Sequence, residues 1–243
     1  MHRFFLSNLQ QPVLDAGEAH HASHVLRLKV GDTVNVFDGR GHEAQASISE
    51  ITGQAVRLKI LQSSTTPALR CRITLAQAIP KKSMDLIVQK ATELGVATII
   101  PLMSERTIVQ LDEDSKKLER WREIALDACK QCNNNWLPEI LPPQKAAAFL
   151  NSLPQSDLKL IGSLQPDAKP LKQILSGTQA FGHSGTSVLL LIGPEGDFTP
   201  AELNLARSVG CLPLSLGPLI LRAETAALYA LSILHHELQV SAA

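Results

Sequence analysis

The residues best suited to ligand chemistry lie in one stretch near the C-terminal end, residues 187–202. Its apolar run ends at Gly193, and Thr199, Pro200 and Glu202 have the types and spacing of a helix N-cap, a first-turn proline and a capping-box carboxylate. The residues between Gly193 and this cap are therefore predicted to form a tight loop at the carboxyl end of a buried strand. Open α/β sheets bind their ligands at such loops.

A second stretch repeats this arrangement, because the apolar residues 212–216 end at Gly217 and an alanine-rich helix is predicted to begin near Ala223. Neither loop has the glycine and lysine spacing of a phosphate-binding or dinucleotide-binding motif, and the first one contains Glu195 and Asp197. These features disfavour triphosphates and dinucleotides. They favour a ligand with an apolar ring and a positive centre, although on spacing alone the glycines are equally ordinary turn residues.

Two groups of residues have metal-ligand types. His20 and His24 would share one face of a helix, next to His21, but no further ligand follows at a suitable spacing. Cys129 and Cys132 form a C-x-x-C pair in a helical run, without a second pair to complete a zinc site. We therefore expect no metal.

Length and composition predict a globular protein with one large domain or two unequal ones. The chain has 243 residues, of which 44% are hydrophobic and 19% are charged. No apolar run approaches the roughly 20 residues that span a bilayer, and the N-terminus has no pattern of a signal peptide. We expect a soluble, cytoplasmic protein with no membrane partner, whose four cysteines are reduced.

The overall charge gives no argument for a nucleic-acid partner, because 23 basic residues balance 23 acidic ones. Within residues 70–90, however, five basic residues stand against the single carboxylate of Asp85. On charge alone, the favoured interpretation of this window is a solvated helix face.

The pattern of apolar residues predicts two domains. Residues 33–62 alternate in short runs separated by turn residues, which indicates a β-meander and a small barrel, preceded by a helix over 18–28. Residues 63–67 break this pattern, so we place the boundary between domains 1–68 and 69–243.

The second domain is predicted to be α/β, because apolar runs without alternation are followed by helical segments. Strands are expected over residues 73–79, 96–102, 158–162, 188–193 and 212–217, and helices over 84–94, 115–132 and 224–238. This order predicts a parallel sheet with helices on both faces.

Taken together, several segments resemble one known family. Residues 192–196 (Ile-Gly-Pro-Glu-Gly), Leu216-Gly217 and residues 220–226 (Ile-Leu-Arg-Ala-Glu-Thr-Ala) resemble the bacterial family that methylates uridine N3 in 16S ribosomal RNA, within the knotted SPOUT superfamily. Residues 24–27, 89–96, 104–107 and 138–140 are also similar to family signatures. The resemblance extends over nearly the whole chain, and the combination of motifs is specific.

The resemblance implies a fold, a cofactor and partners. It implies a PUA-like N-terminal β-barrel over residues 1–68 that helps to bind RNA. It implies a SPOUT α/β domain over 69–243, with a mostly parallel sheet and a C-terminal trefoil knot, that binds S-adenosylmethionine. The implied partners are 16S ribosomal RNA or the small ribosomal subunit and a second copy of the chain, with no metal.

The resemblance also implies site residues. The implied donor-binding residues are Gly162, Ser163, Leu164, Ile192, Gly193, Pro194, Glu195, Gly196, Leu216, Gly217, Ile220, Leu221, Thr225 and Ala226. The implied RNA contacts are Arg3, Arg27, Arg106, Lys81 and Lys82.

Arg222 and Glu224 are the candidate catalytic residues. Uridine N3 must lose a proton before it accepts a methyl group, and a positive group beside the uracil oxygens would stabilise the resulting anion. Arg222 either supplies that charge or pairs with Glu224 or Glu195 to hold the loops. Glu224 either caps the last helix or contacts the base, and a carboxylate or a bound water takes the proton.

Three positions depart from the family pattern and leave two alternatives open. Asn134 stands where the family usually has arginine, Asp197 where it has a second glycine, and Leu219 where a basic residue is common. One alternative is a non-catalytic RNA-binding or ribosome-assembly protein. The other is a SPOUT methyltransferase acting on transfer RNA, which the barrel-first order and the segment 220–226 disfavour.

Overall fold

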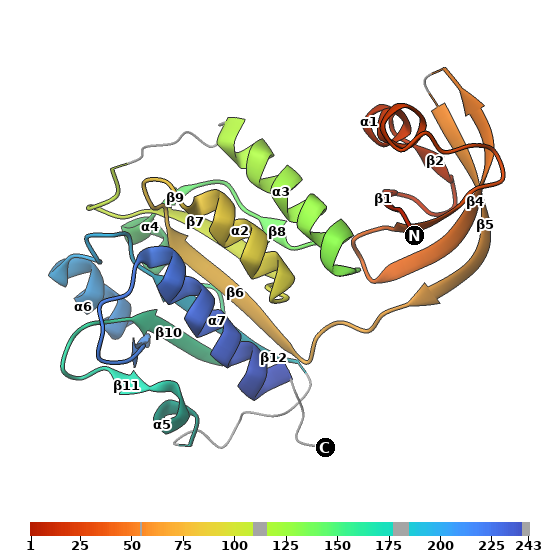
Figure 1. Ribbon diagram of the computed structural model, residues 1–243. Coiled ribbons are helices and arrows are strands. Elements are labelled where there is room, and N and C mark those ends of the chain that lie inside the picture. The colour runs from red at the N-terminus through yellow and green to blue at the C-terminus, as the bar shows by residue number, and fades with distance from the viewer. Residues whose placement is uncertain (54, 109–115, 177–184, 240–243) are drawn as a thin grey trace. The chain divides into compact units, whose positions relative to one another are not determined.

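A computed structural model describes residues 1–53, 55–108, 116–176 and 185–239 (Figure 1). The chain divides into two compact units. The first contains Met1–Ala68 and Leu126–Leu137, and the second contains Leu69–Ala125 and Pro138–Ala243. The assignment of functional domains to residues 1–68 and 69–243 stays a prediction. No helix in the described ranges has the length and apolar character needed to span a membrane.

The first unit is built on a five-stranded mixed sheet in the order β1-β3-β4-β5-β2. Its elements are β1 (Arg3–Phe5), β2 (Val13–Leu14), α1 (Ala16–His20), the π-helix η1 (His21–Val25), β3 (Thr33–Phe37), β4 (His42–Thr52) and β5 (Ala55–Thr65). β1 pairs with β3 in parallel, and the other pairs are antiparallel. Alternate residues of these strands, such as Val34, Val36, Ala46 and Ile48, are buried in one core. The small N-terminal β domain predicted from the alternation is thus confirmed.

Two boundaries in this unit were predicted wrongly. β5 continues to Thr65 instead of ending by residue 62, because Thr65 pairs with His42 on the long neighbouring strand. The predicted helix over 18–28 is a short α-helix followed by a single π-helical segment that ends at Val25. Arg27 then has a left-handed backbone, with φ at +56°, which cannot continue a right-handed helix.

The second unit is built on an eight-stranded sheet in which every pair of the described strands is parallel. Its order is β11-β13-β10-β12-β6-β7-β8, with β9 also paired to β7. The strands are β6 (Cys71–Ala78), β7 (Thr98–Met103), β8 (Glu139–Ile140), β9 (Gln144–Lys145), β10 (Leu158–Gly162), β11 (Lys169–Pro170), β12 (Thr186–Ile192) and β13 (Leu212–Ser215). The predicted α/β class is confirmed, while the trefoil knot stays a prediction.

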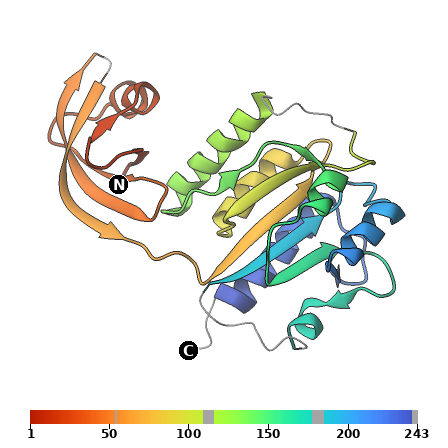
Figure 2. The ribbon, with the colours of Figure 1, turned by 180° about the vertical axis from the view of Figure 1, so that it is seen from behind.

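Helices cover both faces of this sheet, and its central strands are therefore buried on both sides. The helices are α2 (Met84–Glu93), α3 (Lys116–Cys132), α4 (Ala146–Asn151), α5 (Leu171–Ser176), α6 (Pro200–Ser208) and α7 (Ala223–Gln239). α2 and α7 pack together on one face (Figure 1). α4 and α6 contribute Phe149 and Leu203 to the core on the opposite face, which Figure 2 shows from behind. The predicted helix over 115–132 agrees with α3, apart from Ser115, which lies outside the described residues.

Candidate functional site

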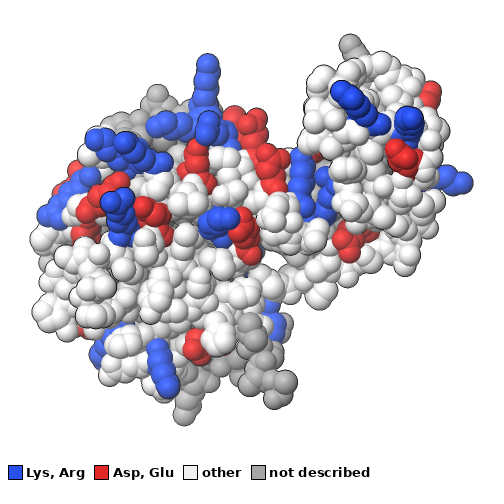
Figure 3. Space-filling view, in the orientation of Figure 1, with Lys and Arg blue, Asp and Glu red and all other residues white. Residues whose placement is uncertain are grey.

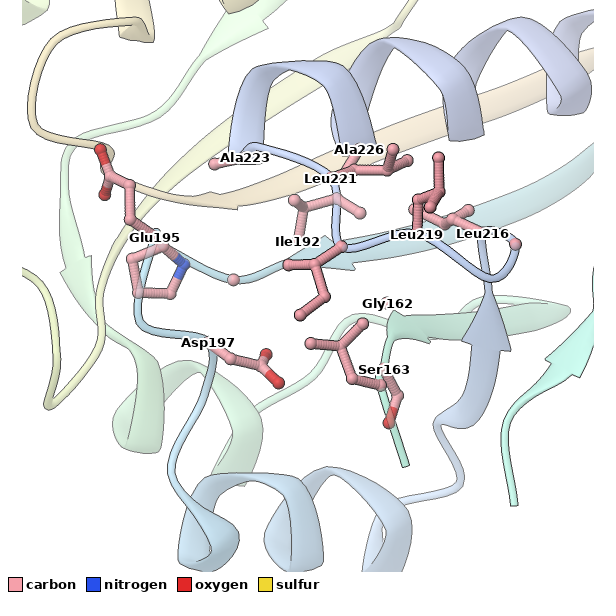
Figure 4. Close-up of a pocket in the computed structure, with 15 residues that line it drawn as sticks. Gly162, Ser163, Ile192, Glu195, Asp197, Leu216, Leu219, Leu221, Ala223 and Ala226 are labelled. Atoms are coloured by element: carbon pink, nitrogen blue, oxygen red, sulfur yellow. The ribbon is translucent and has the colours of Figure 1, made fainter. Parts of the chain in front are cut away.

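Three adjacent strands end at one side of the sheet and form the floor of the candidate site. β10 lies between β12 and β13 and pairs with both in parallel, so the carboxyl ends of all three point the same way. The segments that follow them bring residues 162–164, 192–197 and 216–226 together (Figure 4). This is the edge where a parallel sheet presents its loops to ligands.

These loops enclose a cavity of about 600 Å³, including its open mouth. The residues that line it are Gly162, Ser163, Leu164, Ile192, Gly193, Pro194, Glu195, Asp197, Leu216, Gly217, Leu219, Ile220, Leu221, Ala223 and Ala226. Most of them are small or apolar, and the charged ones are two carboxylates. The cavity therefore suits a ligand with a flat apolar part and a cationic part better than a phosphorylated one.

The loop after β12 is a tight turn that needs an unusual backbone. The Asp197 N–H donates to the Pro194 carbonyl at 2.9 Å, and Asp197 itself has φ at +59°. Its Oδ1 accepts from the Phe198 N–H at 2.8 Å. Aspartate is one of the few residues besides glycine that tolerate this conformation, which explains how it stands where the resembled family usually has glycine.

Gly193 is closely packed in the same turn. A Cβ at Gly193 would lie 3.0 Å from Asp197 Oδ1 and 3.3 Å from Asp197 Cα, so a side chain there would force the turn to shift by a few tenths of an ångström. The predicted capping box after the turn is confirmed, since Thr199 Oγ1 accepts from the Glu202 N–H and Glu202 Oε2 accepts from the Thr199 N–H. The turn is therefore fixed at both ends.

The two carboxylates of the cavity differ in direction. Glu195 Oε1 accepts from the Lys81 N–H at 2.9 Å, which ties the loop after β12 to the loop after β6. Figure 4 shows the Glu195 side chain turned toward that outer side and the Asp197 side chain turned inward. Among the described residues, Asp197 forms no ion pair within 4.0 Å. Asp197 is thus the carboxylate that can meet a cationic ligand.

The segment after β13 forms an apolar rim. Gly217 has φ at +108°, a conformation reserved for glycine, and the chain beyond it leaves large apolar side chains in solvent. Leu219 is 72% exposed and Ile220 is 83% exposed. Exposed apolar side chains at the mouth of a cavity indicate a surface that a ligand or a partner covers.

The two candidate catalytic residues lie where this rim meets α7. Arg222 is exposed between two residues that line the cavity, Leu221 and Ala223. Within the described residues it forms no ion pair within 4.0 Å with Glu224 or Glu195, so the structure gives no support to the interpretation of Arg222 as a residue that pairs with them. Glu224 Oε2 instead accepts from the Ser83 hydroxyl at 2.9 Å, which connects the start of α7 with the start of α2.

Most of the predicted donor-binding residues come together in the cavity, and two do not. Gly196 lies under the Arg106 side chain, and Thr225 is exposed on α7; neither lines the cavity. Conversely, Asp197, Leu219 and Ala223 line it although they were not predicted to. Asp197 and Leu219 were visible in the sequence only as departures from the family pattern.

The predicted RNA-contact residues have varied surroundings. Arg3 is half-buried in the first unit, where its guanidinium lies 4.0 Å from the centre of the Phe37 ring and donates to the Cys129 carbonyl and to Asn135. Burial lowers the pKa of Arg3 below its usual value. This geometry uses Arg3 inside the unit and gives no support to a phosphate contact. Arg27 is exposed.

The other predicted contacts are in the second unit. Arg106 donates from Nη1 to the Gly196 carbonyl at 2.6 Å and so supports the loop after β12. Lys81 and Lys82 are both exposed in the loop between β6 and α2. The RNA contacts of all these residues stay predictions.

The metal-type residues have structural surroundings. The rings of His20 and His24 stack at 4.6 Å. Cys129 is buried, and burial raises the pKa of its thiol to about 12, while Cys132 is partly exposed. Within the described ranges, no three His, Cys, Asp or Glu side chains are grouped closely enough to hold a metal.

Comparisons with known proteins extend over both units. Residues 67–235 match the family model described as RNA methyltransferase domain, and residues 14–61 match the one described as RNA methyltransferase PUA domain. The chain is 29% identical to the ribosomal RNA small subunit methyltransferase E of Bacillus subtilis (strain 168), over 99% of this chain and 98% of the relative.

Two solved structures are similar over nearly their whole length. One is the ribosomal RNA small subunit methyltransferase E of Neisseria gonorrhoeae bound to S-adenosylmethionine, with 33% identity, a TM-score of 0.86 and 98% of each chain covered. The other is a methyltransferase structure from Legionella pneumophila in complex with the same cofactor, with 35% identity, a TM-score of 0.86 and 96% of each chain covered.

Proposed function

We propose that this chain, which belongs to the ribosomal RNA small subunit methyltransferase E family, transfers the methyl group of S-adenosylmethionine to RNA of the small ribosomal subunit. The observation that carries the proposal is the cavity at the carboxyl ends of β10, β12 and β13. The modified atom in our proposal is N3 of a uridine in 16S ribosomal RNA. We place the reaction in the cytoplasm, where ribosomal subunits are found.

The residues that line the cavity fit the donor in their chemistry. Leu164, Ile192 and Leu221 offer apolar surface to an adenine ring, while Gly193 and Gly217 leave backbone groups accessible. Twelve of the predicted donor-binding residues line this cavity, and we propose that they hold the donor.

Asp197 complements the charge of the donor. S-adenosylmethionine carries a positive sulfonium and a positive ammonium group, and no lysine or arginine is found among the described residues that line the cavity. The Asp197 carboxylate faces inward without an ionic partner among the described residues. We propose that it binds one of these cationic groups, whereas Glu195 holds the loop through Lys81.

When bound, the donor supplies an electrophilic methyl group on sulfur. The chain has to position uridine N3 and to stabilise it as an anion. Arg222 is exposed beside the cavity, so its guanidinium can donate to the uracil oxygens O2 or O4 on which the negative charge develops. Glu224 keeps one oxygen on Ser83 and has its other oxygen available to accept the N3 proton. We propose these two residues as catalytic.

A second copy of the chain is the proposed cover of the apolar rim. Leu219 and Ile220 are exposed next to the donor cavity, and Tyr229 on α7 is 47% exposed. Burying them against a partner subunit would also shield the reacting groups from water. Sedimentation equilibrium at micromolar concentration is expected to give the mass of a dimer, and a monomer at all concentrations would contradict this part of the proposal.

Calorimetric titration with S-adenosylmethionine tests the proposed cavity. Ala226→Phe places a ring in the cavity from the first turns of α7, while Ser232→Phe adds the same ring at an exposed position further along that helix. We expect saturable binding by the wild type and Ser232→Phe and none by Ala226→Phe. Normal binding by a folded Ala226→Phe variant would place the donor elsewhere.

A further inference from the structure

A basic groove lies beside the loop that holds the donor cavity. Its walls are the loop between β6 and α2, the start of α2 and the start of α3. The groove is lined by Ile79, Pro80, Lys81, Lys82, Met84, Asp85, Lys116, Lys117, Arg120 and Trp121. Five of these side chains are cationic and one is anionic. Figure 3 shows lysine and arginine side chains gathered over the start of α3.

Asp85, the one carboxylate among the described residues of the groove, is already engaged. Asp85 Oδ2 accepts from Arg120, at 2.8 Å from Nε and 2.7 Å from Nη2, and Asp85 Oδ1 accepts from Trp121 Nε1 at 3.1 Å. Four lysines of the groove form no ion pair within 4.0 Å with any described residue. They are Lys81, Lys82, Lys116 and Lys117. Four such charges around one groove favour a polyanion.

Two hydrogen bonds connect the groove with the proposed site of methyl transfer. The N–H of Lys81 donates to Glu195, and Glu195 belongs to the loop that lines the donor cavity. Ser83, two residues after Lys81, holds the carboxylate of Glu224. The loop of Lys81 and Lys82 is therefore hydrogen-bonded both to the donor-cavity loop and to Glu224, and these two lysines share the groove with Lys116 and Lys117.

We propose that this groove binds the phosphate backbone of the RNA substrate next to the modified nucleotide. The inference rests on the proposed function and extends the predicted contacts of Lys81 and Lys82 to Lys116 and Lys117. Lysine is a flexible point charge, so these contacts position the backbone and do not read its sequence. Asp112, Glu113 and Asp114 precede Lys116 in the sequence and lie outside the described residues, so the lysines themselves have to be tested.

The test is the salt dependence of RNA binding by Lys116→Gln/Lys117→Gln. Its matched control is Lys169→Gln/Lys172→Gln, which removes two exposed lysines that do not line the groove, on the edge strand β11 and on α5. Fluorescence anisotropy would measure affinity for a transcript of small-subunit ribosomal RNA at several salt concentrations. Calorimetry with S-adenosylmethionine would show that each variant is folded.

Each lysine–phosphate contact contributes about 0.7 to 0.9 to the slope of log affinity against log salt. We therefore expect Lys116→Gln/Lys117→Gln to lower the slope by about 1.4 to 1.8, with weaker binding at low salt, and the control variant to keep the wild-type slope. Equal slopes for the wild type and Lys116→Gln/Lys117→Gln would overturn the groove assignment while leaving the proposed function intact. A wild type that binds S-adenosylmethionine but neither binds nor methylates the RNA would refute the proposed substrate and the groove together.

Discussion

Replacing Asp197 by asparagine isolates its charge from its structural role. Asparagine has the same shape, its amide oxygen can accept from the Phe198 N–H, and it tolerates a φ of +59°. The turn after β12 should therefore survive the change. What the Asp197→Asn variant loses is a negative charge that faces the donor cavity.

The size of the effect follows from the surroundings of the carboxylate. Two unit charges about 5 Å apart interact by about 2 to 3 kcal/mol at an effective dielectric constant of roughly 20 to 40. Because Asp197 is partly exposed to water, we discount this to about 1 kcal/mol. The affinity for S-adenosylmethionine should then fall about fivefold.

Calorimetry with two analogues of the donor separates the effect of the Asp197 charge from any change in the shape of the cavity. 5′-Methylthioadenosine shares the adenosine part of the donor but has neither of its positive groups, so its affinity should be the same in the wild type and in Asp197→Asn. S-adenosylhomocysteine, which lacks only the sulfonium, identifies which positive group Asp197 meets. Unchanged binding of S-adenosylmethionine, or an equal loss for it and for methylthioadenosine, would show that the Asp197 charge does not bind the donor.

Three further predictions follow from the site and the buried thiols. Arg222→Ala should lower kcat by about 100-fold or more and change the affinity for S-adenosylmethionine by less than about threefold. If calorimetry showed that the variant no longer binds S-adenosylmethionine, Arg222 would instead be needed to maintain the donor cavity. Ser83→Ala should lower kcat about tenfold, because Glu224 loses its hydrogen bond, at a cost of roughly 1 kcal/mol in the free energy of unfolding; an unchanged kcat would argue against Glu224 as the proton acceptor. At pH 8, iodoacetamide should modify Cys132 well before Cys129, whose buried thiol has a pKa of about 12, and mass spectrometry showing the reverse order would contradict the burial.

The α/β domain was largely predictable because its strands are buried on both faces. The resulting apolar runs, such as residues 188–193, contrast sharply with the helical spacing that follows them. The short strands β8, β9 and β11 were not predicted, since two residues cannot show a period. Tertiary pairing also extended β5 through a polar segment that reads as a linker.

The site was predictable where residue type determines backbone geometry. Gly193 and Gly217 were singled out in the sequence, and the structure shows a crowded turn at one and a left-handed φ at the other. The role of Asp197 was not predictable, because aspartate can replace glycine in such a turn and still direct its side chain inward. The same holds for Arg3, whose stacking on Phe37 depends on a contact between distant segments.

Transfer of labelled methyl groups to RNA tests the central proposal most directly. Purified protein would be incubated with labelled S-adenosylmethionine and either small ribosomal subunits or bulk transfer RNA, and the nucleosides would then be identified by mass spectrometry. We expect a single labelled nucleoside, N3-methyluridine, in 16S ribosomal RNA and none in transfer RNA. Label in transfer RNA alone would show a different methyltransferase, and no label in either RNA, from protein that binds the donor, would indicate a non-catalytic RNA-binding protein.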